Sequence, residues 1–169
     1  MRILIATLFA ASLAAHAADL NDPQIATVAL TAHQIDIDRG NLAVKKTKNA
    51  EVKQFAEQMV KDHGDGKAEV LGLAKKLNVT PQESDVTKSL KDQAKQSMKK
   101  LHGEKGAAFD KDYIDTEVAY HQAVIDAVNK VLIPGSKNAE LKSALTNAVP
   151  TFEAHLAHAK NVQAQVSGK

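Results

Sequence analysis

Apolar residues recur every three or four positions along most of the chain from residue 22 onward. The clearest run, over residues 50–77, places these residues on one face of a helix: Val52, Phe55, Met59, Val70, Leu73 and Leu77. Asn49 precedes the run, and asparagine is one of the residues that cap helix N-termini. The pattern therefore predicts an amphipathic helix that begins after Asn49 and ends near Leu77.

The same spacing predicts four further helices, bounded by capping and breaking residues. Asp22-Pro23 is a capping residue followed by proline at the first helical position, a typical helix start. Pro81 and Ser84 mark a break, and Pro134-Gly135 marks a stop. Pro150 lies inside the last helix and predicts a kink there. The five predicted helices cover residues 22–48, 50–77, 85–101, 107–133 and 138–166.

Four long helices and one short helix favour an all-α fold. With the short helix placed in a long connection, the arrangement expected is a ferritin-like antiparallel four-helix bundle with one crossover. A plain five-helix array is the alternative.

The first 17 residues have the features of a secretory signal peptide. Arg2 is followed by an apolar run from Ile3 to Ala15, and Ala15-His16-Ala17 is a small-residue cleavage pattern. The run falls short of the roughly 20 apolar residues that a membrane span needs, and no second candidate follows. We expect cleavage after Ala17, a single bundle domain over residues 18–169, and a periplasmic location that is compatible with loose outer-membrane association.

The composition excludes several classes of function. The chain has no cysteine, which excludes disulfides, thiol catalysis and thiolate metal sites. Its net charge of +2 becomes +1 when Arg2 is removed with the leader, so there is no electrostatic footprint for nucleic acid. No nucleophile–base pattern or glycine-rich phosphate loop is present, so neither a conventional hydrolase nor a nucleotide enzyme has support.

Several polar residues lie on the apolar faces of the predicted helices. His63 falls within about 40° of the apolar centre of the helix over residues 50–77. Gly66 shares this face, where it would leave room beside the imidazole or let another helix approach. His155 lies on the apolar face of the last helix.

The other two long helices show the same feature. Asp110, Glu117 and His121 lie near the middle of the apolar arc of residues 107–133, and Asp36 and Arg39 lie on the apolar face of residues 22–48. An unpaired buried charge costs several kcal/mol, so these groups need partners.

These polar groups also lie at similar depths. Asp36, His63, Glu117 and His155 each lie near the middle of a helix, which at 1.5 Å per residue keeps them within about two turns of one level. Four helices are thus expected to direct a polar group at the bundle centre. The remaining histidines of the bundle are expected at face edges or in solvent: His33, His102 and His158.

Four short motifs resemble a bacterial exported family known as "domain of unknown function 4142". They are QMVKDH at 58–63, FDKDY at 109–113, the E-x-x-x-H of Glu117 and His121, and HLAHA at 155–159. The resemblance spans nearly all of residues 18–169 and implies a ferritin-like fold and an exported protein, without an established activity. The motif residues are Met59, Asp62, His63, Asp110, Tyr113, Glu117, His121 and His155, of which the helical wheel places Asp62 on the flank.

The sequence departs from the di-iron proteins of the ferritin-like class. Those proteins carry an E-x-x-H pair on each of two helices. Here Glu117 and His121 are four positions apart, and no glutamate accompanies His63. An oxidase-type di-iron centre is therefore not expected.

Two interpretations of the polar cluster remain open. One is a hydrogen-bonded network that fixes helix register, in which Arg39 pairs with Glu117 or Asp110. The other is a metal site with nitrogen ligands from His63, His121 and His155 and oxygen ligands from Glu117 or Asp36, a donor set that suits zinc, copper or iron. Arg39 favours the network, because a cation would repel a metal ion. A metal-dependent oxidoreductase is the alternative function.

Overall fold

The computed structural model describes residues 20–167, which form helices joined by short connections. The predicted signal peptide lies outside the described residues. The elements are α2 (Asp22–Lys46), α3 (Ala50–Lys76), α4 (Asp85–Gly103), α5 (Gly106–Ala127), the π-helix η2 (Val128–Leu132), α6 (Ile133–Gly135) and α7 (Ala139–Ser167). All five predicted helices are present, and α3 runs unbroken through Gly64 and Gly66.

Local capping explains where the helices begin. Asn49 caps α3 through its side chain, as predicted, and Ser84, which was expected to mark a break, caps α4. At α2, however, the cap is Asn21, which forms a capping box with Gln24. Asp22 has a different role: its carboxylate accepts hydrogen bonds from the backbone N–H groups of residues 137 and 138. It thereby ties the start of α7 to the start of α2.

The helix after residue 106 differs from the sequence prediction at its end. Residues 128–132 form a π-helical turn, in which the N–H of Ile133 bonds the carbonyl of Val128, five residues back. Pro134 has no N–H to bond the carbonyl four residues before it, which weakens α-helical pairing at this point. The chain continues helically through Pro134 to Gly135 instead of stopping before them.

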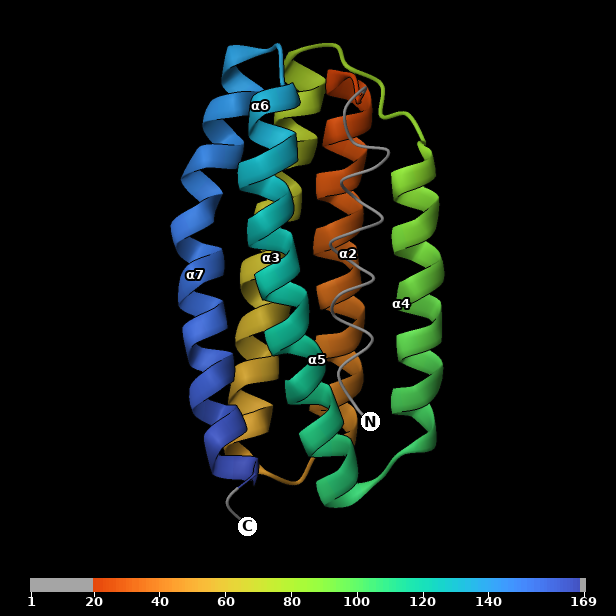
Figure 1. The fold of residues 1–169 in the computed structure, drawn as a ribbon, viewed down its shortest axis with the longest axis vertical. Coiled ribbons are helices and arrows are strands. Elements are labelled where there is room, and N and C mark those ends of the chain that lie inside the picture. The colour runs from red at the N-terminus through yellow and green to blue at the C-terminus, as the bar shows by residue number, and fades with distance from the viewer. Residues whose placement is uncertain (1–19, 168–169) are drawn as a thin grey trace.

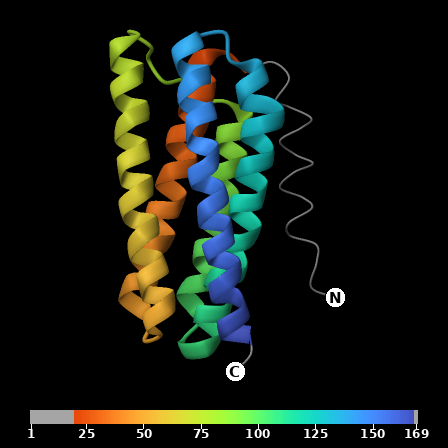
Figure 2. The same ribbon diagram turned by 90° about the vertical axis from the view of Figure 1, so that its left-hand side faces the viewer.

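Four of the helices form an antiparallel bundle (Figures 1 and 2). α3 packs against α2 and α7, and α5 packs against α7 and α2, so the order around the bundle is α2, α3, α7, α5. Each neighbouring pair runs in opposite directions in Figure 1. α4 lies outside this bundle against α2 and α5 and returns the chain to the end where α5 begins. The expected four-helix bundle with an additional helix in the crossover is confirmed as an all-α helical bundle.

The bundle core consists of two apolar layers with polar residues between them. One layer surrounds Ile25, Leu132 and Leu145, and the other surrounds Phe55, Met59 and Phe109. The side chains between them are polar although they are almost fully buried: Asp36, Arg39, His63, Glu117, His121 and His155.

Within residues 20–167, no helix is both long enough and apolar enough to cross a membrane.

Candidate functional site

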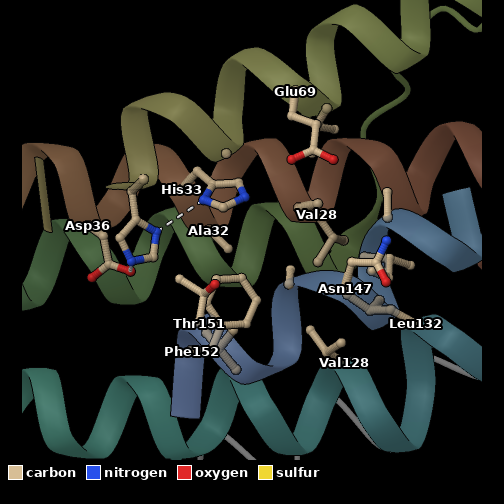
Figure 3. A pocket seen from close by; sticks show the side chains of 18 of the residues that line it. Val28, Ala32, His33, Asp36, Glu69, Val128, Leu132, Asn147, Thr151 and Phe152 are labelled. Carbon is tan, nitrogen blue, oxygen red and sulfur yellow. Dashed lines mark hydrogen bonds and ion pairs between the residues drawn. The ribbon is translucent and has the colours of Figure 1, made fainter. Parts of the chain in front are cut away.

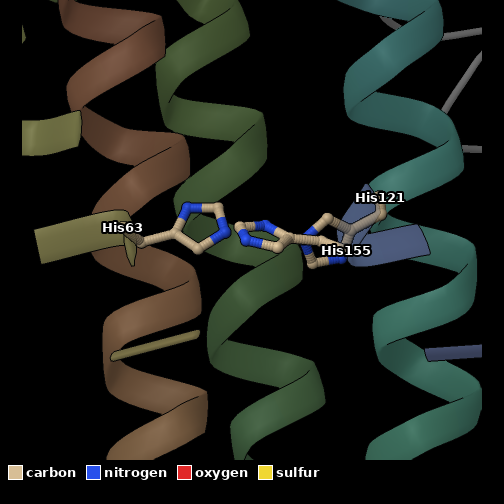
Figure 4. A group of neighbouring side chains, drawn as sticks. All are labelled: His63, His121 and His155. Carbon is tan, nitrogen blue, oxygen red and sulfur yellow. The ribbon is translucent and has the colours of Figure 1, made fainter. Parts of the chain in front are cut away.

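Three histidines from three helices meet in the polar layer. His63 of α3, His121 of α5 and His155 of α7 have ring centroids 5.2–5.5 Å apart (Figure 4). One ring nitrogen from each lies within 4.8 Å of the others. Their side chains are only 1–3% exposed. The convergence of these three residues at one depth agrees with the helical-wheel prediction.

Two of these imidazoles have their tautomer fixed by a hydrogen bond. The Nδ1 of His121 lies 3.0 Å from the carbonyl oxygen of Glu117. A carbonyl only accepts, so Nδ1 carries the hydrogen and Nε2 carries the lone pair. The Nε2 of His155 lies 3.0 Å from the carboxylate of Asp62, which leaves the lone pair on Nδ1. The flank position of Asp62 on α3 therefore does not prevent it from reaching the cluster.

The third imidazole has a partner that the helical wheel placed at a face edge. His33 is buried, and its Nδ1 lies 3.0 Å from the Nδ1 of His63. One nitrogen of the pair donates to the other, and when His63 donates, its Nε2 carries the lone pair. Gly66 does leave room for an imidazole, but for that of His33: a Cβ at Gly66 would lie 2.6 Å from the His33 ring. In the sequence, the feature that indicates this contact is Gly66, a small residue on the face of α3 that packs against α2.

The inner nitrogens of the three rings lack hydrogen-bond partners within residues 20–167. These atoms are the Nε2 of His63, the Nε2 of His121 and the Nδ1 of His155. Burial lowers the pKa of His63 to about 3, and it lowers the pKa values of His121 and His155 as well. The rings are therefore neutral at pH 7, which is the form that binds metal ions.

A second group, of two carboxyls and one of the same histidines, adjoins the first. Asp36, Glu117 and His121 each place one ligand atom within 4.8 Å of the others. Burial raises the pKa of Glu117 well above its usual value, and the nearby charge of Asp36 raises it further. Burial also raises the pKa of Asp36, to about 6, against the opposing effects of a hydrogen bond with Glu117 and the charge of Arg39. At pH 7, Glu117 is thus the protonated member of the pair.

Arg39 lies on the carboxyl side of the layer. Its guanidinium carbon is 4.5 Å from the centre of the Tyr120 ring. The expected ion pair with Glu117 or Asp110 is not formed: among residues 20–167, no carboxylate lies within 4.0 Å of the Arg39 nitrogens. The charge of Arg39 still lowers the pKa of Asp36 and Glu117.

The remaining predicted residues lie away from the two groups. Met59 and Tyr113 pack in the apolar layer around Phe55. Asp110 is buried but belongs to neither candidate ligand group. His158 bonds the side chain of Gln58, and His102 is exposed at the end of α4, as expected.

The two groups cannot both bind a metal ion through His121. With its Nδ1 hydrogen donated to the carbonyl of Glu117, the ring has a single lone pair to offer. The arrangement therefore suits one ion and not two. This agrees with the spacing of Glu117 and His121, which argues against a di-iron centre.

The fold and the buried layer define this chain as an all-α helical-bundle protein with a central histidine–carboxyl cluster. Residues 8–162 match the family described as "Domain of unknown function (DUF4142)", and the chain belongs to this family. No curated protein matches the chain. A similar solved structure is that of a protein described as secreted, DUF305 from Streptomyces coelicolor. It is 14% identical over 85% of this chain and 92% of that one, with a TM-score of 0.69. At this identity, the similarity supports the fold alone.

Proposed function

We propose that the protein binds one transition-metal ion through ring nitrogens of His63, His121 and His155, with Asp36 and Glu117 as adjacent oxygen donors. A single observation carries the proposal: three buried, neutral imidazoles each place one ring nitrogen within 4.8 Å of the others, and each ring has one nitrogen without a hydrogen-bond partner and a second that is hydrogen-bonded. Imidazole donors suit zinc, copper and iron.

The hydrogen bonds behind the rings resemble those of metal sites. Metal-ligating histidines usually donate their other N–H to a carboxylate or a carbonyl, which fixes the ring. Asp62 and the carbonyl of Glu117 fill these roles for His155 and His121. A network that served stability alone would also partner the inner nitrogens, since each unsatisfied buried group costs about 1–3 kcal/mol. A bound cation would offset that cost.

We also propose that the protein is exported to the periplasm and that its bundle is of the ferritin-like type. The leader pattern of residues 1–17 supports export. The antiparallel bundle with a polar layer near its middle supports the ferritin-like type. Mass spectrometry of native protein is expected to show Ala18 at the N-terminus, and an intact Met1 in the cell envelope would contradict export.

The metal site is tested by metal analysis of protein purified from the periplasm without an affinity tag, followed by calorimetric titration with Zn²⁺, Cu²⁺ and Fe²⁺. One ion per chain is expected for at least one of these metals. His63→Ala and His121→Ala are each expected to abolish stoichiometric retention. His102→Ala, which removes an exposed histidine, is the matched control and retains the ion.

Melting curves separate the metal site from a purely structural network. A ligand at about 100 times its Kd stabilises a protein by about 2.7 kcal/mol, so chelator is expected to lower the Tm of the metal-loaded protein. A protein that retains no metal and melts identically with and without chelator would establish the network instead.

A further inference from the structure

A cavity of about 490 Å³ lies between α2, α3, α7 and the end of α5, next to the histidine cluster (Figure 3). Well-packed domains contain few voids larger than a water molecule, and this volume falls in the range of small-molecule sites. Most of its wall is aliphatic or aromatic, with Val28, Leu90, Val128, Leu132, Leu145 and Phe152 as the larger apolar contributors.

The cavity is elongated along the bundle axis, and its buried polar residues lie at one end, the polar end. Its wall extends from Val28 to Asp36 on α2 and from Asp62 to Val70 on α3. Each of these spans is nine residues, whose eight steps rise about 12 Å along the helix. On α2 the apolar lining lies toward Val28, and Asp36 lies at the other end beside Asp62 of α3; the acidic residues Asp65 and Glu69 lie along α3 between Asp62 and Val70.

The cavity opens to solvent between α3 and α7. Asp65 and Glu69 of α3 and Asn147 and Thr151 of α7 line it and are exposed. A molecule can therefore reach the apolar interior through this seam without passing between the tightly packed α2 and α3.

The charged residues of the wall have one sign. Asp36, Asp62, Asp65 and Glu69 contribute to the lining, and within residues 20–167 no lysine or arginine does. Lys61 pairs with Asp62 and Asp65 from outside the cavity. The Oδ1 of Asp36, whose side chain is 1% exposed, has no hydrogen-bond partner. Such a wall repels carboxylates and phosphates and attracts a cationic head group.

The π-helical turn supports a binding role independently. Val128 and Leu132, the first and last residues of η2, both line the cavity. π-helical turns carry poorer backbone geometry than α-helix and occur frequently at functional sites. Here the turn forms part of the apolar wall opposite α3.

We infer that this cavity binds a primary amine with an apolar chain of about eight carbons, a length that matches the 12 Å over which α2 and α3 line it. The chain lies along the apolar wall toward Val28. The ammonium lies at the polar end, where Asp36 and Asp62 supply carboxylate acceptors. This inference goes beyond the proposed metal site and does not depend on it, although both use the environment of His63.

Head-group preference is tested with three ligands of one chain length on chelator-treated protein. Isothermal titration calorimetry with n-octylamine, n-octanol and n-octanoate is expected to give 1:1 binding of octylamine, at least about tenfold tighter than octanoate and tighter than octanol. Failure of octylamine to bind, or octanoate or octanol binding as tightly, would overturn the inference.

The location is tested with two matched substitutions on α7. Ala148 lines the cavity and Ala157 is exposed beyond it. Ala148→Phe fills the apolar space and is expected to weaken octylamine at least about tenfold, whereas Ala157→Phe leaves it unchanged. Ala144→Phe, at a second lining position, serves the same purpose if Ala148→Phe fails to fold. Unchanged octylamine binding in a folded cavity variant would overturn the location.

The two proposals can fail separately. Metal titration of Ala148→Phe is expected to match wild type, because none of the proposed ligands is altered. Loss of octylamine binding with metal binding retained supports the cavity assignment. Metal binding without any amine binding in wild type would remove this inference and leave the metal site standing.

Discussion

The polar layer has two halves that are equally buried and chemically different. The imidazole half consists of His63, His121 and His155, supported from behind by His33 and Asp62. The carboxyl half consists of Asp36 and Glu117 with Arg39 beside them. In the imidazole half, burial removes the charge and leaves one nitrogen of each ring without a hydrogen-bond partner. In the carboxyl half, burial leaves a proton on Glu117, and the cation of Arg39 offsets the charge of Asp36.

The difference shows that burial of an ionisable residue does not by itself indicate a ligand site. What decides is the charge state that each group keeps and the ligand atoms that it can offer. The carboxyl half compensates most of its charge internally, because Glu117 keeps its proton and Arg39 offsets the charge of Asp36. Both halves keep buried atoms without hydrogen-bond partners, but those of the imidazole half belong to neutral rings, whereas those of the carboxyl half belong to Asp36, Arg39 and Glu117. The two halves are therefore expected to respond differently to substitution and to pH.

The largest expected effect comes from removing the cation of the carboxyl half. Arg39→Met leaves the buried charge of Asp36 uncompensated, and the free energy of unfolding is expected to fall by about 3 kcal/mol at pH 7. The loss is smaller at pH 5, because Asp36, with a pKa of about 6, binds a proton there. Denaturant unfolding at both pH values measures this.

Lys53→Met, which removes an exposed cation of α3, is the control and is expected to change stability by less than about 0.5 kcal/mol. An Arg39→Met loss of equal size at pH 5 and pH 7 would show that Arg39 stabilises the fold through packing on Tyr120 and not through charge.

The two halves are also expected to contribute slopes of opposite sign to the dependence of stability on pH. Burial lowers the pKa of His33 from 6.5 to about 3, so between these values the unfolded state binds more protons and stability falls as pH falls. His33→Gln is expected to reduce this slope by up to about 1.4 kcal/mol per pH unit near pH 4–5.5.

Glu117 has the opposite sign, because its pKa is raised in the folded state. Its stabilising contribution is present at low pH and is lost as pH rises above the ordinary value of 4.5. Glu117→Gln is therefore expected to make stability rise more steeply with pH. Urea unfolding curves from pH 4 to 7 measure both slopes, and a change of the same sign in the two variants would contradict the division of the layer.

A smaller effect is expected from Asp62, which supports the imidazole half by its hydrogen bond with His155. Asp62→Asn replaces the carboxylate that accepts from His155, and metal affinity is expected to fall about tenfold. Asp65→Asn removes an exposed carboxylate from the same helix and is expected to leave affinity near wild type. Equal losses in competition titrations of the two variants would attribute the effect to the general acidity of α3 instead of the hydrogen bond.

The smallest expected effects come from two glycines on α3. Gly64→Ala adds a Cβ that meets nothing within 4 Å, so the helix propensity of alanine is expected to stabilise the fold by about 0.5–1 kcal/mol. Gly66→Ala brings the same gain in helix propensity, but its Cβ overlaps the His33 ring. This overpacking is expected to leave the variant about 1 kcal/mol less stable than wild type. Thermal melts of both variants measure the difference, and stabilisation by Gly66→Ala would show that His33 moves freely.

Most of the fold was accessible from the sequence because helix periodicity and capping are local properties. The spacing of apolar residues identified five helices, Asn49 marked the start of α3 correctly, and Pro81 and Ser84 marked the break before α4. The π-helical turn was not predicted. It depends on how Pro134 is accommodated while Val128 and Leu132 keep their places in the core.

The sequence also indicated which residues enter the polar layer, since the direction of a side chain follows from its position on a helical wheel. His63, Glu117, His121, His155 and Asp36 were all placed inside, and all are buried. The wheel misjudged His33, which it placed at a face edge, because the depth of an edge residue depends on how closely the neighbouring helix approaches. Gly66 allows that approach.

Only the tertiary structure decided which atoms meet. The wheel gives a direction for each side chain, but the pairing of ring nitrogens depends on the relative rotation and height of α2, α3, α5 and α7. Asp62 shows this most plainly, since it reaches His155 from the flank of α3. The division into an imidazole half and a carboxyl half, the single lone pair of His121 and the cavity beside them all follow from contacts between residues distant in sequence, which no local pattern encodes.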